Sequence, residues 1–278
     1  MSGVGFIVHE GRPAAVAAAE DLAKLLARDG VGTVWLDDRG AVDLSVIVSV
    51  GGDGTFLRAA HAAQAADCPV LGVKVGRMGF LTEVDPADAV DLIRSVLAGT
   101  ARIEERLAVT AEPEEGGAFE RQWALNEITV EKHTRHRLVR LAVYVDGGYI
   151  TTFSADGIIV ATPTGSTAYS FSARGPIVTP SVNGLVLTPI AAHMVFDRSF
   201  VLDAEQQVSV EVVGEEEGLL SADGRESIDL PVGSRFRIRA AGRPARLVRR
   251  EDAPGFLSLV REKFELPGDD GPRVGSGR

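Results

Sequence analysis

The sequence predicts an α/β protein with an all-β second part: an N-terminal doubly wound α/β domain followed by a β-rich, sandwich-like domain. Two observations lead to this prediction. Short apolar runs alternate with helix-spaced segments up to about residue 100, as in a mostly parallel sheet covered by helices. Beyond that point, short segments with period-2 alternation and turn residues predominate. The length of 278 residues is compatible with two domains.

In the predicted α/β domain, residues 1–100, strands alternate with helices. Pro13 suits a first helical turn, Gly30 a helix C-terminus, and Asp85-Pro86 the start of a further helix. We expect ligands at the carboxyl ends of its parallel strands. The predicted strands are 4–8, 31–36, 45–50 and 69–75, and the predicted helices are 13–29, 55–66 and 86–97.

The predicted β-rich domain covers residues 101–250. Residues 139–145 alternate apolar with other side chains, and Asp146-Gly147-Gly148 is a hairpin turn signal. Residues 252–266 return to helical spacing and are expected to pack on the first domain, whereas the polar segment 267–278 is expected to be disordered. The predicted strands are 103–112, 121–131, 137–145, 150–153, 158–161, 185–188, 199–202, 207–213, 227–230 and 235–239.

Charge and composition exclude several classes of function. The formal net charge of −10 argues against a general affinity for nucleic acid or an anionic membrane. The single cysteine, Cys68, allows no disulfide within the chain, and we expect it to be buried. The N-terminus lacks the features of a signal peptide, and no apolar run approaches the ~18 residues of a membrane span. We therefore expect a cytoplasmic protein.

A glycine loop that contains a carboxylate follows the predicted strand 45–50. It reads Gly51-Gly52-Asp53-Gly54-Thr55, where glycines can adopt positive φ and let a phosphate approach, and Thr55 can cap the next helix. A carboxylate repels the same anions, so Asp53 requires either a metal ion or a proton to remove. The alternative is a tight turn in which Asp53 is only a capping group.

Two further polar stretches are candidate ligand sites. Residues 154–161 run into a loop, 162–169, whose hydroxyl and N–H groups could bind phosphates or an amide, or could simply cap a short helix. Asn126 and Glu127 lie within an apolar strand and point to opposite faces, so at least one could face a cleft and need a partner there. Taken alone, an edge strand that faces solvent is the simpler explanation of this dipeptide.

Taken together, these stretches closely resemble the NAD kinase family over about residues 4–265. The first loop alone is unspecific, because diacylglycerol, sphingosine and 6-phosphofructokinases carry similar loops. Residues 162–169 are much more specific to NAD kinases. The matching motifs are Gly51-Gly52-Asp53-Gly54-Thr55, Asn126-Glu127, Asp156-Gly157, Thr162-Pro163-Thr164-Gly165-Ser166-Thr167-Ala168-Tyr169 and Ser221-Ala222-Asp223-Gly224.

The resemblance implies a reaction and its cofactors. The γ-phosphoryl group of ATP, or of another donor, would pass to the 2′-hydroxyl of the adenosine ribose of NAD and give NADP. Asp53 would be the general base, and Mg²⁺ would offset its repulsion of the donor phosphates; the resemblance assigns no metal ligands. We expect a homodimer or homotetramer with no nucleic-acid or membrane partner. The implied phosphate loop is Gly51, Gly52, Gly54 and Thr55.

The resemblance also implies the dinucleotide contacts. Asn126 and Glu127 would bond the sugar and base of the acceptor, and Asp156 would contact the nicotinamide end. Arg58 and Arg137 would be cationic ligand contacts, or else ordinary exposed charges. The implied set is Asp53, Gly54, Arg58, Asn126, Glu127, Arg137, Ser154, Asp156, Thr164, Thr167, Ala168, Tyr169, Ser170, Phe171 and Ser172.

Three positions depart from the usual family pattern. Arg174 replaces a glycine and would be strained if that position takes positive φ. Ala192 replaces a frequent proline before His193, and Arg225 replaces a polar amide. Two alternatives therefore stay open: a lipid or small-alcohol kinase that uses only the first loop, and a catalytically weak NAD(P)-binding regulator, which Arg174 and Arg225 suggest.

Overall fold

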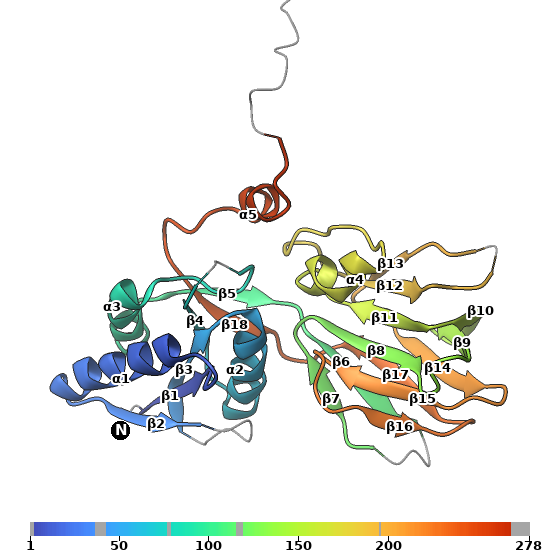
Figure 1. Cartoon of the computed structure of the whole chain (residues 1–278), viewed down its shortest axis with the longest axis horizontal. Helices are drawn as coiled ribbons and strands as arrows, with labels where there is room; N and C mark the ends of the chain where they lie inside the picture. Colours follow the sequence, from blue (N-terminus) through green and yellow to red (C-terminus); the bar gives the residue numbers. More distant parts are fainter. Residues whose placement is uncertain (1–2, 37–42, 77–78, 115–118, 195, 268–278) are drawn as a thin grey trace, which may run out of the picture.

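The computed structural model describes residues 3–36, 43–76, 79–114, 119–194 and 196–267. Within these ranges the chain forms three six-stranded sheets (Figure 1). One sheet carries helices on both faces, and the other two pack face to face, so the predicted α/β and β-sandwich parts are confirmed. Most of the segment expected to be disordered, 267–278, lies outside the described residues. No described helix has both the length and the apolar character to cross a membrane.

The first sheet has the order β2-β1-β3-β4-β18-β5, and all its neighbours are parallel except β18 and β5. Helices α1 and α3 cover one face, whereas α2 covers the other. The loops after β3 and β4 therefore leave the same edge of the sheet. The elements are β1 (Gly3–Val8), α1 (Pro13–Arg28), β2 (Gly32–Trp35), β3 (Leu44–Gly51), α2 (Asp53–Ala66), β4 (Val70–Lys74), α3 (Pro86–Leu97), β5 (Arg102–Arg106) and β18 (Ala245–Arg249).

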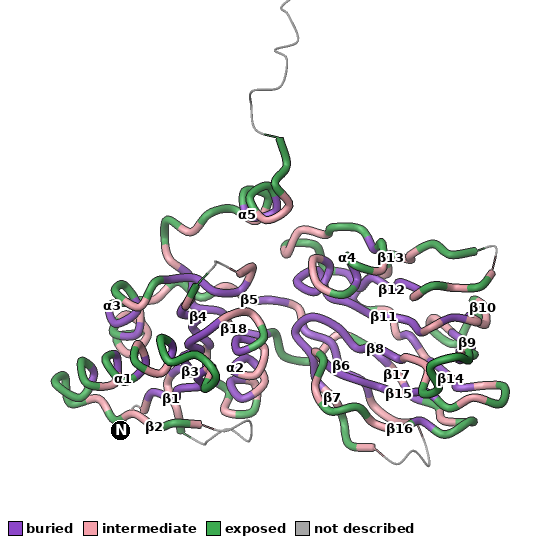
Figure 2. The backbone as a smooth tube through the Cα atoms, viewed as in Figure 1, coloured by how far each residue is buried: buried purple, intermediate pink, exposed green. Residues whose placement is uncertain are grey.

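The other two sheets, β10-β9-β14-β17-β6-β7 and β13-β12-β11-β8-β15-β16, form the sandwich. Their facing side chains, among them Phe153, Phe236, Ile128 and Ile158, share one core, which Figure 2 shows as purple strands. The elements are β6 (Val109–Pro113), β7 (Gln122–Ala124), β8 (Glu127–Lys132), β9 (Val139–Val145), β10 (Gly148–Ala155), β11 (Gly157–Ala161), η1 (Gly165–Thr167), α4 (Tyr169–Ser172), β12 (Gly184–Ile190), β13 (Phe200–Asp203), β14 (Val208–Val213), β15 (Gly218–Ala222), β16 (Ile228–Leu230) and β17 (Arg235–Ala240).

Two predicted strands are wrong as single elements, because each is divided between two sheets. The segment 103–112 forms β5 in the first sheet and β6 in the sandwich, and 121–131 forms β7 and β8 in facing sheets. Strands β15 and β18 were not expected. Strand β18 carries two arginines, Arg246 and Arg249, whose charges are offset by carboxylates that are distant in the sequence, which no local pattern reveals.

Strand β18 returns the chain from the sandwich to the first sheet, and helix α5 (Phe256–Lys263) follows it. Figure 1 shows α5 above the junction of the two parts. The Phe264 ring, just past α5, lies 6.1 Å from the Phe80 ring of the first part and 4.4 Å from the Phe171 ring of the second. The chain end thus contacts both parts.

Candidate active site

Asp53 opens helix α2 and is oriented by the loop that follows β4. Its carboxylate accepts the backbone N–H of Phe80 at 2.9 Å and of Leu81 at 3.1 Å. A Cβ on Gly79 would lie 1.8 Å from Asp53 Oδ1, so the loop approaches the carboxylate as only glycine permits. The residue before the helix is Gly52, and no side chain caps α2. The interpretation of Asp53 as a capping group is therefore wrong.

The glycines of the first loop do not have the positive φ that their sequence allows, but two of them leave the backbone open as expected. Gly51, Gly52 and Gly54 all lack positive φ. At Gly52 and Gly54 an added Cβ would meet no atom within 4 Å, so these glycines leave the backbone open to an approaching group. The Thr55 hydroxyl packs against Gly51 and does not cap α2, which corrects the expected cap.

Asn126 and Glu127 lie where the chain crosses from one sheet of the sandwich to the other. Both are buried, with 8% and 7% of their surface exposed, and β8 is a central strand, so the edge-strand alternative is wrong. The Asp223 carboxylate accepts the N–H groups of Leu125, Asn126 and Glu127 at 2.7–3.1 Å. The strand break thus keeps its backbone satisfied without sheet partners.

Glu127 is a buried acid with an open hydrogen-bonding position. Its Oε2 atom is buried and has no partner among the described residues. Burial, and secondarily the charge of Asp223, raise the pKa of Glu127 to about 8. At neutral pH Glu127 therefore carries a proton and can donate a hydrogen bond to a ligand.

The loop 162–165 packs directly on the Leu125-Asn126 break. The Thr162 hydroxyl donates to Leu125 O at 2.6 Å and accepts the Gly165 N–H at 3.1 Å. The Thr162 N–H donates to Asn126 O at 2.8 Å, and a Cβ on Gly165 would lie 2.1 Å from that same oxygen. The residues directly before η1 and α4 provide no side-chain cap, and the bonds of Thr162 join the two polar stretches into one unit.

The remaining residues of this stretch extend the unit along β8. Alternate residues of a strand share a face, so Glu127 and Glu131 lie on the same side of β8. The Tyr169 hydroxyl donates to Glu131 at 3.0 Å, and Asp156 pairs with Lys132 at 2.5 Å. Ser170 is different from its neighbours because it is fully buried and bonded to the Thr188 hydroxyl at 3.2 Å. The polar side chains of Lys132, Asp156 and Tyr169 therefore lie along β8 beyond Glu127.

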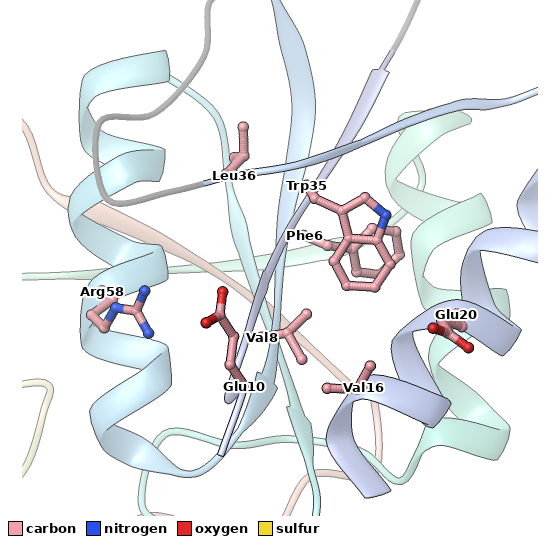
Figure 3. Close-up of a pocket in the computed structure, with 8 residues that line it drawn as sticks. All are labelled: Phe6, Val8, Glu10, Val16, Glu20, Trp35, Leu36 and Arg58. Atoms are coloured by element: carbon pink, nitrogen blue, oxygen red, sulfur yellow. The ribbon is translucent and has the colours of Figure 1, made fainter. Parts of the chain in front are cut away.

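Arg58 and Arg137 do not join this arrangement. Arg58 follows Asp53 by five residues on α2, which is about 140° around the helix axis. It lines a cavity of about 520 Å³ with Glu10 and Trp35, at the β2 edge of the first sheet (Figure 3). Arg137 pairs with Glu216 at 2.5 Å and is 63% exposed, as an ordinary surface charge would be.

Comparison with known proteins decides the family. A model of the ATP-NAD kinase N-terminal domain matches residues 35–101, and a model of the ATP-NAD kinase C-terminal domain matches 125–250. NAD kinase 2 of Streptomyces avermitilis is 38% identical over 95% of this chain and 94% of its own length. NAD kinase of Leifsonia xyli subsp. xyli is 42% identical over 81% of this chain and 75% of its own length. The chain belongs to the NAD kinase family.

Solved structures of the NAD kinase family share the fold. An NAD kinase from Archaeoglobus fulgidus in complex with ATP is 26% identical, with a TM-score of 0.75 over 96% of this chain and 99% of that one. Yeast NADH kinase complexed with NADH is 22% identical, with a TM-score of 0.80 over 99% of this chain and 90% of that one, and it supports the fold alone. The arrangement of the sheet and sandwich is therefore that of the family.

Two of the departures from the usual NAD kinase pattern, Arg174 and Arg225, have visible structural consequences. Arg174 has a φ of 67°, in the left-handed region at the end of α4, so the conditional prediction of backbone strain there is confirmed. The Arg225 guanidinium donates to Trp123 O at 2.6 Å and lies 3.1 Å from His61 Nε2 on α2. Arg225 therefore joins the Asp223 turn to the first part of the molecule.

Several site residues of this family member were not found from the sequence. Gly79, Phe80 and Leu81 orient Asp53, and their signal was a second glycine-containing loop after the predicted strand 69–75. Arg106 donates to the Thr164 hydroxyl at 3.3 Å, although it lies on β5 of the other part. No sequence signal connects those two positions, because 58 residues separate them.

Proposed function

We propose that this protein is an NAD kinase that transfers the γ-phosphoryl group of ATP, or of another donor, to the 2′-hydroxyl of the adenosine ribose of NAD. The observation that carries the proposal is the oriented Asp53 carboxylate in a chain that matches both NAD kinase domain models. The ATP complex of the Archaeoglobus fulgidus NAD kinase supports ATP as the donor. The division into an α/β domain up to about residue 100 and a β-rich domain over 101–250 is part of this proposal, with strands β5 and β18 of the second segment joining the sheet of the first.

Asp53 is the proposed general base. An ionised carboxylate has about four lone-pair sites, and the two N–H groups of Phe80 and Leu81 occupy only part of them. As the ribose 2′-oxygen bonds to the γ-phosphorus and the bond to the β-bridging oxygen breaks, the hydroxyl proton passes to Asp53 and ADP leaves. Fixed N–H donors hold the carboxylate in place, which reduces the reorganisation needed during transfer.

The acceptor would bind along β8. Glu127, protonated at neutral pH, would donate from its open position to the ribose or base, and Asn126 would add an amide donor and acceptor. Asp156 would face the nicotinamide end. The other proposed contacts are Ser154, Thr164, Thr167, Ala168, Tyr169, Ser170, Phe171 and Ser172. Arg58 and Arg137 complete the proposed set, although Arg58 lines another cavity and Arg137 pairs with Glu216.

The donor phosphates would bind at Gly51, Gly52, Gly54 and Thr55, where the backbone at Gly52 and Gly54 is open. Mg²⁺ commonly takes one or two carboxylates together with substrate phosphates and water. Asp53 fits that donor set, and no described group of three or more His, Cys, Asp or Glu side chains could hold the ion alone. The ion would neutralise negative charge on the phosphates.

We also propose a cytoplasmic homo-oligomer, a dimer or a tetramer. The single cysteine, Cys68, is buried and allows no disulfide within the chain, which is compatible with a reducing compartment. The edge strands β10 and β13 expose Tyr149 and Val201, which suit contact with a second copy. Light scattering coupled to gel filtration measures the assembly.

A coupled assay tests the function. The protein is incubated with NAD, ATP and Mg²⁺, and NADP is detected with an NADP-specific dehydrogenase. Asp53→Asn should keep dinucleotide binding and lose about 10²–10⁴-fold in rate. The matched control is Asp67→Asn at the other end of α2, where φ is 50° and asparagine is tolerated.

Three outcomes would contradict the proposal. Unchanged turnover in Asp53→Asn would remove Asp53 from the mechanism. Thermal stabilisation by NADPH without any NADP formation would favour the regulator. No stabilisation and no NADP would favour a lipid or small-alcohol kinase.

A further inference from the structure

A line of buried ionic contacts joins the loop that orients Asp53 to the loop that carries Thr164. Glu83 lies two residues after Leu81, and its carboxylate bonds Arg249 Nη1 at 2.7 Å and the Arg250 N–H at 2.8 Å. The Nε atom of the same Arg249 guanidinium lies 3.0 Å from Glu104 Oε2. These contacts connect the segment after β4 with strands β18 and β5.

The line continues into the sandwich through Arg106. Arg106 Nε bonds Glu104 Oε1 at 2.7 Å, so Glu104 takes one arginine on each oxygen. Arg106 Nη1 then donates to the Thr164 hydroxyl at 3.3 Å. Two carboxylates and two guanidiniums thus alternate between the loop that orients Asp53 and the loop that carries Thr164, which we call the acceptor loop.

These side chains are withdrawn from water. Only 4% of the Glu83 side chain, 8% of Arg249 and 7% of Arg106 are exposed, whereas Glu104 keeps 30%. Buried ion pairs often add little net stability over apolar side chains of similar volume, so stability alone is a weak explanation for three such pairs in series. Their forked hydrogen bonds fix both distance and direction, which suits a geometric role.

Each end of this line is itself fixed. Glu83 N–H donates to Gly72 O at 2.8 Å, which holds the segment 80–84 on β4. Thr164 belongs to the loop that packs on Asn126 through Thr162 and Gly165. A shift of Arg106 would therefore change the position of the acceptor loop relative to Asp53.

We propose that Arg106 and Arg249 are positioning residues for the phosphoryl transfer: through Glu83 and Glu104 they set the separation between Asp53 and the acceptor loop at Thr164. This inference rests on the proposed function. In this role neither arginine touches the substrate. Their loss should reduce kcat more than it weakens either ligand, because each ligand keeps its own contacts while the hydroxyl and the base lose alignment.

The test uses two variants of Arg106 in the full-length protein. Arg106→Met removes both its contact to Glu104 and its contact to Thr164, and should lower kcat by about 10–100-fold. Arg106→Lys keeps the charge beside Glu104 but lacks the fork that reaches Thr164, and should lower kcat less. The KM for ATP and the NADP dissociation constant from calorimetry should change much less than kcat in both variants.

The matched control is Arg246→Lys on β18, the strand that pairs with β5. Arg246 also bonds across elements, to Asp67 at 2.9 Å, but it lies at the surface and outside the ionic line. All assays are run below the unfolding midpoint of the least stable variant. Combining Arg106→Lys with Thr164→Val should then lower kcat by less than the product of the two single effects, because both remove the same contact.

The outcomes separate this inference from the proposed function. A wild-type protein that forms no NADP contradicts the proposed function. An active wild-type protein whose Arg106 variants unfold at lower temperature but keep wild-type kcat contradicts the positioning role. Multiplicative effects of the Arg106 and Thr164 changes would also contradict it.

Discussion

Asp223 and Glu127 hold each other by a reciprocal pair of bonds: Asp223 Oδ1 accepts the Glu127 N–H at 3.1 Å, and the Asp223 N–H donates to Glu127 O at 3.0 Å. The same carboxylate accepts the N–H groups of Leu125 and Asn126. The dipeptide proposed to bind the acceptor is therefore held in place by a residue almost 100 positions later in the chain.

Asp223→Asn tests this anchor. The amide keeps the size but loses the charge and one acceptor oxygen, and hydrogen bonds to charged groups contribute about 1.5–3 kcal/mol. We expect a loss of about 2 kcal/mol in the free energy of unfolding from urea titration and a raised KM for NAD. Asp229→Asn, at an exposed position on β16 of the same sheet, should change neither quantity. An unchanged KM in a destabilised Asp223→Asn would contradict the anchoring role.

The raised pKa of Glu127 predicts a pH dependence. Between the ordinary carboxyl pKa of 4.5 and the folded value of about 8, the folded state keeps a proton that the unfolded state releases. The stabilising contribution of protonated Glu127 is therefore present below pH 4.5 and is lost as pH rises towards 8. NAD affinity should also weaken above pH 8, where Glu127 loses its donor.

Glu127→Gln is the comparison for both effects. The amide is isosteric and does not titrate, so the pH-dependent difference in the free energy of unfolding between the two proteins should follow the Glu127 titration. The affinity of Glu127→Gln for NAD, measured by calorimetry, should be the same below and above pH 8. A wild-type affinity that is equally level would show that Glu127 does not donate to the ligand as a neutral acid.

Gly79→Ala should remove much of the activity. The new methyl group would occupy the position 1.8 Å from Asp53 Oδ1, so the carboxylate or the loop must move. A displacement of about 1 Å can cost about 10²-fold in rate, and we expect a loss of that order in kcat. Gly32→Ala on β2, where an added Cβ meets no atom within 4 Å, is the control. Wild-type kcat in Gly79→Ala would show that the orientation of Asp53 by this loop is unimportant.

Arg174→Gly should stabilise the protein by about 1 kcal/mol, because a side chain at φ 67° costs about 1–2 kcal/mol that glycine does not. Arg174→Ala keeps this cost and should not stabilise. Thermal unfolding of the three proteins distinguishes the backbone effect from the loss of the side chain. Turnover should be unchanged in both variants, and a marked rise in turnover for Arg174→Gly would instead support the weakly catalytic alternative.

The order of strands and helices in the first hundred residues could be predicted from the sequence, since each element carries its own period and end signals. Asn126-Glu127 shows the limit of this reasoning. Read locally, the dipeptide is a polar interruption in one strand; in the structure it is a crossing between two sheets, with both side chains buried. The bonds that make the crossing possible come from Asp223 and Thr162, which no local pattern relates to it.

Arg58 and Arg137 illustrate the same limit in the opposite direction. From the sequence, both arginines are expected to be cationic contacts to the ligand. In the structure, the rotation along α2 directs Arg58 to another cavity, and Arg137 pairs with Glu216. Where a long side chain reaches depends on elements that are distant in the sequence.

The sequence alone determined the alternation of strand and helix, the switch to β structure and the chemical identity of the motif residues, because these depend on local periodicity, turn residues and side-chain type. Only the tertiary structure decided how Asp53 is oriented, why Glu127 keeps a proton and how Arg106 reaches Thr164. Those properties come from burial and from contacts between distant segments, which exist only once the sheet and the sandwich have packed together.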